Sequence, residues 1–181
     1  HIPVDVYDLG VDMLSASAHK FNGPKGVGFL YIRSGLKVMP YSDGGAQEFG
    51  LRAGTENVAG IVGMAVALKN NCDALEENTR YVEGLASELV GMLNSSGVKY
   101  AMNGGTNRLP GLLSLSFPEF DGEAILHRLD LAGICISTGS ACNSKSTEIS
   151  HVLQAIHLGD KYAKGTIRIS LGKDNIEDDV E

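Results

Sequence analysis

Lys20 follows His19 at the end of an apolar run, residues 11–17, and precedes a connection rich in Gly and Pro, FNGPKG. A free Lys is a poor nucleophile at neutral pH because its reference pKa is about 10.4. A Schiff base to an aldehyde cofactor removes this obstacle, since the nitrogen is then held as an imine. A solvated Lys at a turn is the ordinary alternative, so the His-Lys pair alone leaves both interpretations open.

A second candidate is the Gly-rich stretch DGGAQEFGLRAGTENV, which reaches Thr55 just before a helix that we predict over residues 56–70. Free backbone N–H groups, the positive end of the helix dipole and the Thr hydroxyl would together suit a phosphate group. A simple N-cap role for Thr55 is the alternative. Glu56 would oppose an anion unless its side chain pointed away.

Cys142 is surrounded by small and polar residues, STGSACNSKSTE, in a predicted loop. A structural Cys is usually buried among apolar neighbours, whereas a reactive one needs an accessible setting. Because the reference pKa of a thiol is about 8.5, Lys145, His151 or a bound cofactor would have to help form the thiolate. Catalytic and incidental roles both remain open. The other two cysteines, Cys72 and Cys135, are predicted to be packing residues.

Arg168 lies between Ile167 and Ile169 in a predicted strand over residues 166–171. Its guanidinium group could hold a carboxylate through two parallel hydrogen bonds. Alternation along the strand slightly favours the other interpretation, in which the side chain simply points outward. The remaining histidines show no metal-ligand spacing, so we predict no metal site.

The composition and net charge of the sequence argue against several classes of function. The 181-residue chain has 15 Lys and Arg against 22 Asp and Glu, a net charge of −7, which argues against nucleic acid or an anionic membrane as a partner. The longest apolar run, residues 58–68, is too short for the ~20 residues that span a bilayer. Three Cys without a CxxC pair fit neither a disulfide framework nor a zinc site. We therefore expect a reducing, cytoplasmic location.

Two domains are predicted to position these residues. In the first, residues 1–95, two buried strands over 11–17 and 27–32 flank the turn with Lys20, and an amphipathic helix over 73–93 links this domain to the next. The remaining residues are predicted to form a small α+β domain. Its predicted elements are strands over 112–117, 133–137 and 166–171 and helices over 121–131 and 147–157.

Five segments resemble, in this order, the cysteine desulfurases of the class V aminotransferase group, which are pyridoxal-phosphate (PLP) enzymes: HKFNGPKGVGFLYIR, GLRAGTENVAGIVGMA, LPGLLSLSF, STGSAC and IRISLG. The resemblance extends almost from His1 to Glu181. It implies an α/β fold, in which residues 1–95 are the C-terminal part of the large PLP-binding domain of the PLP-dependent transferases (fold type I). Residues 96–181 would be a small α+β C-terminal domain that carries the catalytic Cys loop.

The resemblance also implies roles for the candidates in the first domain. Lys20 would form the Schiff base with PLP, and Ser17 and His19 would bind the phosphate of the cofactor. Thr55 would reach the phosphate of the neighbouring subunit's PLP, so the full-length protein would be a homodimer.

The implied reaction converts L-cysteine to L-alanine. Arg168 would hold the substrate carboxylate, the amine of Lys20 would abstract the Cα proton, and Cys142 would take up the sulfur as a persulfide. The sulfur would then pass to an acceptor or scaffold protein, for the assembly of iron–sulfur clusters or thio-cofactors.

Two features depart from the family. Asn143 and Ile149 differ from the usual residues near the Cys, which bears on the choice of acceptor and on the rate of loop motion. The family's N-terminal half, with the Asp that faces the pyridine nitrogen, is absent from this sequence, so we expect the chain alone to bind PLP poorly and to turn over little or nothing. The competing interpretations are another class V PLP enzyme, such as a selenocysteine lyase or an aminotransferase, and a non-catalytic fragment that acts as an interaction module.

Overall fold

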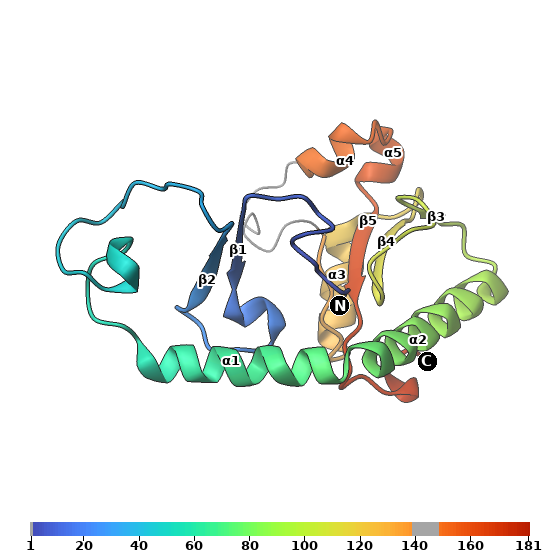
Figure 1. Cartoon of the computed structure of the whole chain (residues 1–181). Coiled ribbons are helices and arrows are strands. Elements are labelled where there is room, and N and C mark those ends of the chain that lie inside the picture. The colour runs from blue at the N-terminus through green and yellow to red at the C-terminus, as the bar shows by residue number, and fades with distance from the viewer. Residues whose placement is uncertain (1, 139–148) are drawn as a thin grey trace. The chain divides into compact units, whose positions relative to one another are not determined.

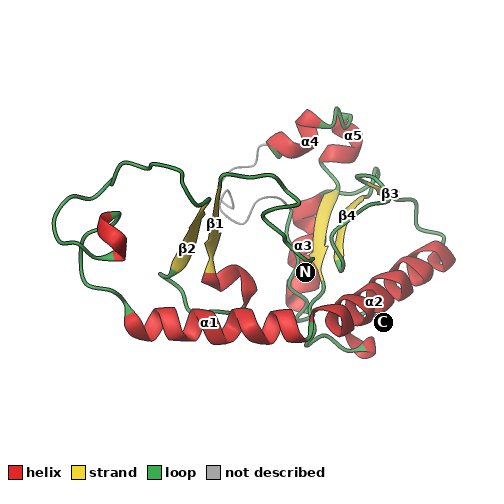
Figure 2. Cartoon of the chain, in the orientation of Figure 1, coloured by secondary structure: helices red, strands yellow, loops and turns green. Residues whose placement is uncertain are grey.

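The computed structural model describes residues 2–138 and 149–181 (Figure 1). The described chain divides into a first unit, Pro3–Leu75, and a second unit, Glu76–Glu181 with Ile2. Both units contain helices and strands (Figure 2), as expected for the predicted α/β class.

A pair of antiparallel strands carries the turn that contains the His-Lys pair. In the first unit, β1 (Met13–Ser17) pairs with β2 (Gly28–Ile32), and Ser17 lies opposite Gly28. A Cβ atom at Gly28 would lie 2.4 Å from the carbonyl oxygen of Ala16, so the pairing requires glycine at this position. The two predicted strands are confirmed.

Three helical segments complete the first unit: η1 (Ala18–Phe21), η2 (Glu48–Gly50) and α1 (Val58–Asp73). The 3-10 turn η1 follows β1 directly and packs on α1. Nδ2 of Asn71 on α1 donates a hydrogen bond to the carbonyl oxygen of Phe21 at 2.8 Å. This contact fixes the turn against the helix.

The prediction that β1 and β2 are buried is wrong within the first unit. Phe29 and Leu30 on β2 are 36% and 51% exposed, and the buried hydrophobic residues described in this unit are Ala18 and Met64. The physical reason is that α1 packs mainly on the η1 turn and not on the strand faces. A strand whose faces meet no second layer stays accessible to solvent.

An antiparallel sheet in the order β3-β4-β5 forms the centre of the second unit. Its strands are β3 (Ala101–Met102), β4 (Leu112–Ser116) and β5 (Thr166–Ser170). The helical segments described with it are α2 (Leu75–Ser96), α3 (Gly122–Leu131), α4 (His151–Ala155), α5 (Asp160–Ala163) and the short turn η4 (Glu177–Asp179). Asp121 caps α3, because its Oδ1 accepts a hydrogen bond from the N–H of Ala124 at 3.1 Å.

Alternate residues of β4 and β5, together with Phe117 directly after β4, form the core of the second unit. Leu113, Leu115, Phe117 and Ile167 are at most 8% exposed, and hydrophobic side chains of α2 and α3 pack against them. The intervening positions of the two strands are largely polar, namely Ser114, Ser116, Thr166, Arg168 and Ser170. The sheet therefore has one apolar face covered by helices and one polar face.

The helix predicted to link the two domains belongs with the second unit. Leu89, Val90 and Leu93 of α2 pack against the core formed by β4 and β5, because the apolar stripe of this helix finds its apolar partner there. The division between the two units falls after Leu75. The assignment of the two parts to the large and small domains of a PLP enzyme stays a prediction.

The strand predicted over residues 133–137 is reduced to a single bridge. The N–H groups of Gly133 and Ile134 donate back to carbonyl oxygens of α3 and complete the end of that helix. These groups are therefore not available for pairing with a strand. Ser137 alone forms a β-bridge, with Arg168.

The helix predicted over residues 147–157 is shorter in the structure. α4 begins after Ser150, whose Oγ accepts a hydrogen bond from the N–H of Val152 at 3.3 Å. The helix ends before His157, which has a left-handed backbone with φ of 56°. Residues 147 and 148 lie outside the described part of the chain.

Candidate active site

Three polar side chains are displayed at the end of β1. Ser17 is the last residue of the strand, and His19 and Lys20 lie in η1. All three are exposed, whereas Ala18 is fully buried and its N–H donates to the carbonyl oxygen of Val27 at 3.0 Å. Because the buried Ala anchors the turn, a hydroxyl, an imidazole and an amine are presented together. We call Ser17, His19 and Lys20 the Lys20 cluster.

The Gly-rich stretch before α1 is braced by its own side chains. Nη1 of Arg52 donates to the carbonyl oxygens of Gly54 and Thr55 at 3.0 and 3.2 Å, and Oε1 of Gln47 accepts from the N–H of Gly54 at 3.1 Å. A β-bridge between Ser42 and Arg52 closes the loop. Arg52 and Gln47 were not among the predicted site residues, because no local pattern marks a side chain that braces its own loop.

The alternative interpretation of Thr55, as the N-cap of the helix, is wrong. α1 begins at Val58, and its N-cap is Asn57, whose Oδ1 accepts a hydrogen bond from the N–H of Gly60 at 3.1 Å. Asn is a preferred N-cap because its short amide reaches an otherwise unpaired N–H of the first turn. Thr55 is exposed two positions earlier, so the cap does not use its hydroxyl.

Replacing Asn57 with alanine is expected to lower the free energy of unfolding by about 1 kcal/mol, because the N–H of Gly60 loses its acceptor. The matched change Thr55→Ala is expected to lower it by less than about 0.5 kcal/mol, since Thr55 is an exposed residue that caps nothing. Urea unfolding followed by circular dichroism measures both. A larger loss for Thr55→Ala than for Asn57→Ala would contradict the cap assignment.

Thr55 and the η1 turn with Lys20 meet α1 at different positions along the helix. The η1 turn meets the helix at Asn71, through the hydrogen bond to Phe21, whereas Thr55 precedes the first helical turn. At about 1.5 Å per residue, these two positions are about 20 Å apart along the helix axis. Thr55 is therefore not part of the Lys20 cluster of its own chain.

Arg168 lies on the polar face of the sheet in the second unit. It pairs with Ser114 of β4 on one side and with Ser137 on the other, where its N–H donates to the carbonyl oxygen of Ser137 at 2.6 Å. Its side-chain Nε is buried and has no hydrogen-bond partner among the described residues. A buried N–H donor without an acceptor is costly, so this atom is suited to an anionic ligand.

The chain entering residues 139–148 is anchored on α3. The hydroxyl of Thr138 donates a hydrogen bond to Oε1 of Glu123 at 2.7 Å, and Glu123 lies in the first turn of the helix. Cys142, the predicted sulfur-accepting residue, lies outside the described residues.

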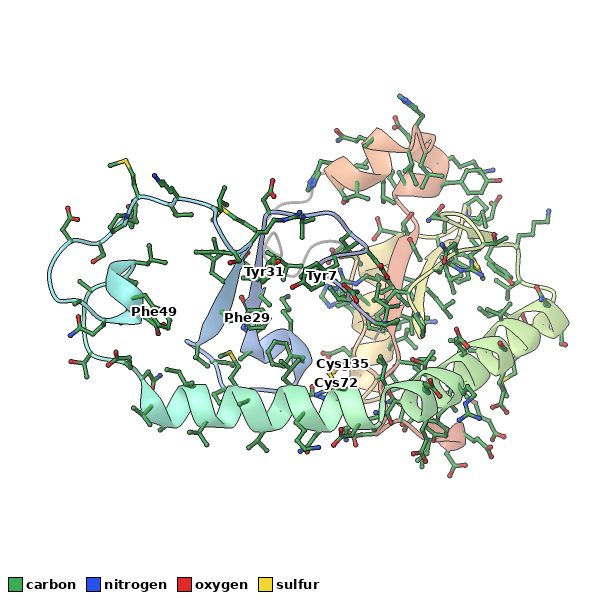
Figure 3. All side chains as sticks on the ribbon, in the orientation of Figure 1. Tyr7, Phe29, Tyr31, Phe49, Cys72 and Cys135 are labelled. Carbon is green, nitrogen blue, oxygen red and sulfur yellow. The ribbon has the colours of Figure 1, made fainter. Side chains whose placement is uncertain are left out.

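Cys72 and Cys135 are exposed, so the prediction that they are packing residues is wrong (Figure 3). Cys72 is near the end of α1, and Cys135 follows the turn that ends α3. The apolar sides of these segments are occupied by larger residues, such as Met64 on α1. Neither Cys was predicted to be catalytic.

Two exposed groups outside the predicted site have shifted pKa values. The pKa of Lys69 is raised by its hydrogen bond and ion pair with Asp73 on α1. The pKa of Asp179 is lowered by hydrogen bonds from the side chain of Asn175 and the N–H of Ile176. The described residues contain no group of three or more His, Cys, Asp or Glu arranged to hold a metal ion, and none of their helices is long and apolar enough to cross a membrane.

The family model for aminotransferase class V matches residues 1–181. The chain belongs to this family. Among curated relatives of this class V chain, the cysteine desulfurase IscS of Dictyoglomus turgidum is 47% identical over an alignment of 181 positions, which covers 99% of the chain and 46% of the relative. A cysteine desulfurase of Klebsiella pneumoniae is 46% identical and covers 99% of the chain and 45% of the relative. The chain thus spans about half the length of these relatives.

Solved structures support the same family. A NifS-like protein matches this class V chain with a TM-score of 0.86 and 42% identity, covering 99% of the chain and 46% of the neighbour. SspA in complex with cysteine matches with a TM-score of 0.69 and 34% identity, covering 96% and 47%. The predicted fold class is therefore confirmed.

Proposed function

We propose that this class V chain is part of a cysteine desulfurase that converts L-cysteine to L-alanine and takes up the sulfur on Cys142. The observation that carries the proposal is the display of the Lys20 cluster at the end of β1, in a chain 47% identical to a cysteine desulfurase. Because the chain covers 46% of that relative, we propose the activity for an enzyme of the relatives' full length.

The Lys20 cluster fits PLP, the cofactor that the family implies. PLP carries an aldehyde and a phosphate group. The Lys20 amine is the group that condenses with an aldehyde, and the Ser17 hydroxyl and the His19 imidazole can donate hydrogen bonds to phosphate oxygens. All three residues are exposed and therefore accessible to a ligand. When bound, PLP would act as the electron sink for bonds at the substrate Cα.

Three residues of this chain would carry out the other steps of the reaction: proton transfer, binding of the substrate carboxylate and removal of the sulfur. Nζ of Lys20 takes the proton from the substrate Cα and later delivers a proton to the product. The guanidinium group of Arg168 binds the substrate carboxylate. The Cys142 thiolate attacks the substrate sulfur, so that a new S–S bond forms as the substrate C–S bond breaks. The electron pair of that bond stays with carbon, which is protonated and leaves as alanine.

We also propose the partners of the reaction. Thr55 would face the phosphate of the PLP held by the other subunit of a homodimer, and its exposure and its separation from η1 along α1 support this. The persulfide sulfur would pass to an acceptor or scaffold protein in the cytoplasm, for iron–sulfur cluster or thio-cofactor assembly. The neighbour solved in complex with cysteine supports L-cysteine as the substrate.

The chain alone is expected to form alanine from L-cysteine about a hundredfold more slowly than the same chain joined to the N-terminal half of the Dictyoglomus turgidum relative, because that half of the relative would supply electrostatic contacts to the cofactor. We call the latter the joined protein. Quantifying alanine at saturating L-cysteine and PLP compares the two. Equal rates would overturn the expected inactivity of the chain, and no alanine from either would overturn the proposed function.

A further inference from the structure

On the polar face of the sheet in the second unit, a series of linked hydrogen bonds connects Thr166, Ser116, Asn103 and Ser114, and the donor and acceptor of each bond can be assigned. The hydroxyl of Thr166 donates to the carbonyl oxygen of Tyr162 at 2.8 Å, and a carbonyl oxygen can only accept. The hydroxyl hydrogen of Thr166 is therefore used in this bond. Oγ of Ser116 lies 2.7 Å from Oγ1 of Thr166, so Ser116 must be the donor in that pair. Ser116 and Thr166 are 0% and 5% exposed, so water does not compete for these groups.

This direction also fixes the amide of Asn103. Because the hydrogen of Ser116 is used, Oγ of Ser116 must accept from its remaining partner, which is Nδ2 of Asn103 at 2.8 Å. The second hydrogen of the same Nδ2 goes to Oγ of Ser114 at 3.1 Å. Ser114 therefore accepts from Asn103, and its own O–H hydrogen points elsewhere. The described residues offer no acceptor for that hydrogen.

Ser114 lies directly opposite Arg168 in the register of β4 and β5. Directly opposed residues of an antiparallel pair project from the same face, with Cβ atoms about 4.5 to 5.5 Å apart. Nε of Arg168 is buried and lacks an acceptor among the described residues. The same place on the sheet thus holds two donors that lack an acceptor, one of them on a permanent cation.

We propose that Ser114, oriented by Asn103, is a second donor to the carboxylate that Arg168 binds and is therefore a specificity-determining residue. A carboxylate has two oxygens and accepts without donating, so one oxygen can take the guanidinium N–H groups while the hydroxyl of Ser114 donates to the other. The inference rests on the proposed function, in which this carboxylate is that of L-cysteine. Asn103 acts as a positioning residue.

The test is an NMR titration of the full 181-residue chain with propionate and with L-alanine, and with alaninamide, which lacks the carboxylate, as the negative control. Ser114→Ala is expected to raise the dissociation constant of both carboxylates about tenfold, as for loss of a hydrogen bond to a charged group. Ser114→Thr keeps the hydroxyl and is expected to restore binding. Ser170→Ala is the matched control, because Ser170 is an exposed residue of β5 outside this series of hydrogen bonds.

Equal dissociation constants for Ser114→Ala and the unchanged chain would overturn the role of Ser114, and so would equal weakening by Ser170→Ala. Absence of any propionate or L-alanine binding to the unchanged chain would overturn the carboxylate site as a whole. If the dissociation constants follow the expected pattern but the joined protein forms no alanine, the carboxylate site is supported and only the desulfurase function is refuted.

Discussion

Replacing Lys20 with alanine is expected to lower the rate of alanine formation by the joined protein by at least about a thousandfold. The Lys20 amine is proposed both to bind the cofactor aldehyde and to move the substrate Cα proton, and a positioned acid or base alone contributes about 10² to 10⁴ in rate. The Lys20 cluster offers a histidine as the nearest substitute, but His19 cannot provide the primary amine that condenses with an aldehyde.

Lys25→Ala is the matched control for this change. Lys25 is exposed in the same connection between β1 and β2, so its removal alters the charge of the turn by the same amount. Its expected effect on the rate is less than about threefold, as for an exposed residue that takes no part in the reaction. Borohydride reduction with PLP, followed by peptide mass analysis, should place the pyridoxyl group on Lys20. A Lys20→Ala variant that keeps more than a tenth of the rate would contradict the assignment.

Replacing Cys142 with alanine is expected to abolish transfer of sulfur from L-cysteine to the joined protein and to lower alanine formation at least about a hundredfold. The thiolate is proposed to be the nucleophile that removes the sulfur, and no hydroxyl or amine can form the same persulfide. Radiolabelled L-cysteine measures the bound sulfur, and chromatography measures the alanine. Undiminished alanine formation would instead favour another class V enzyme that needs no thiol, such as a lyase or an aminotransferase.

Cys72→Ala and Cys135→Ala are the controls for this second prediction. Both side chains are exposed, so both thiols are open to adventitious reaction with sulfur. We expect each variant to keep the labelled persulfide and the rate within about twofold. Loss of label in either one would show that the sulfur is not held on Cys142.

Helices and strands whose type and position depend on residues close together in the chain could be predicted from the sequence. Alternating and apolar runs located β4 and β5, the connection FNGPKG located the hairpin of β1 and β2, and Asp121 located the start of α3. The Lys20 cluster could be predicted for the same reason, because consecutive residues at a strand end remain neighbours in any fold. Local backbone preferences and helix caps depend on residues that are adjacent in the chain, and these residues can be read from the sequence.

The burial, the pairing and the orientation of side chains were decided by tertiary structure. α2 joined the second unit because its apolar stripe packs on the core of β4 and β5, and β1 and β2 remained exposed because α1 packs on the η1 turn instead. The role of Ser114 depends on partners distant along the chain, Asn103 and Arg168. No local pattern encodes such a juxtaposition, because burial and hydrogen-bond direction depend on which segments the folded chain brings together.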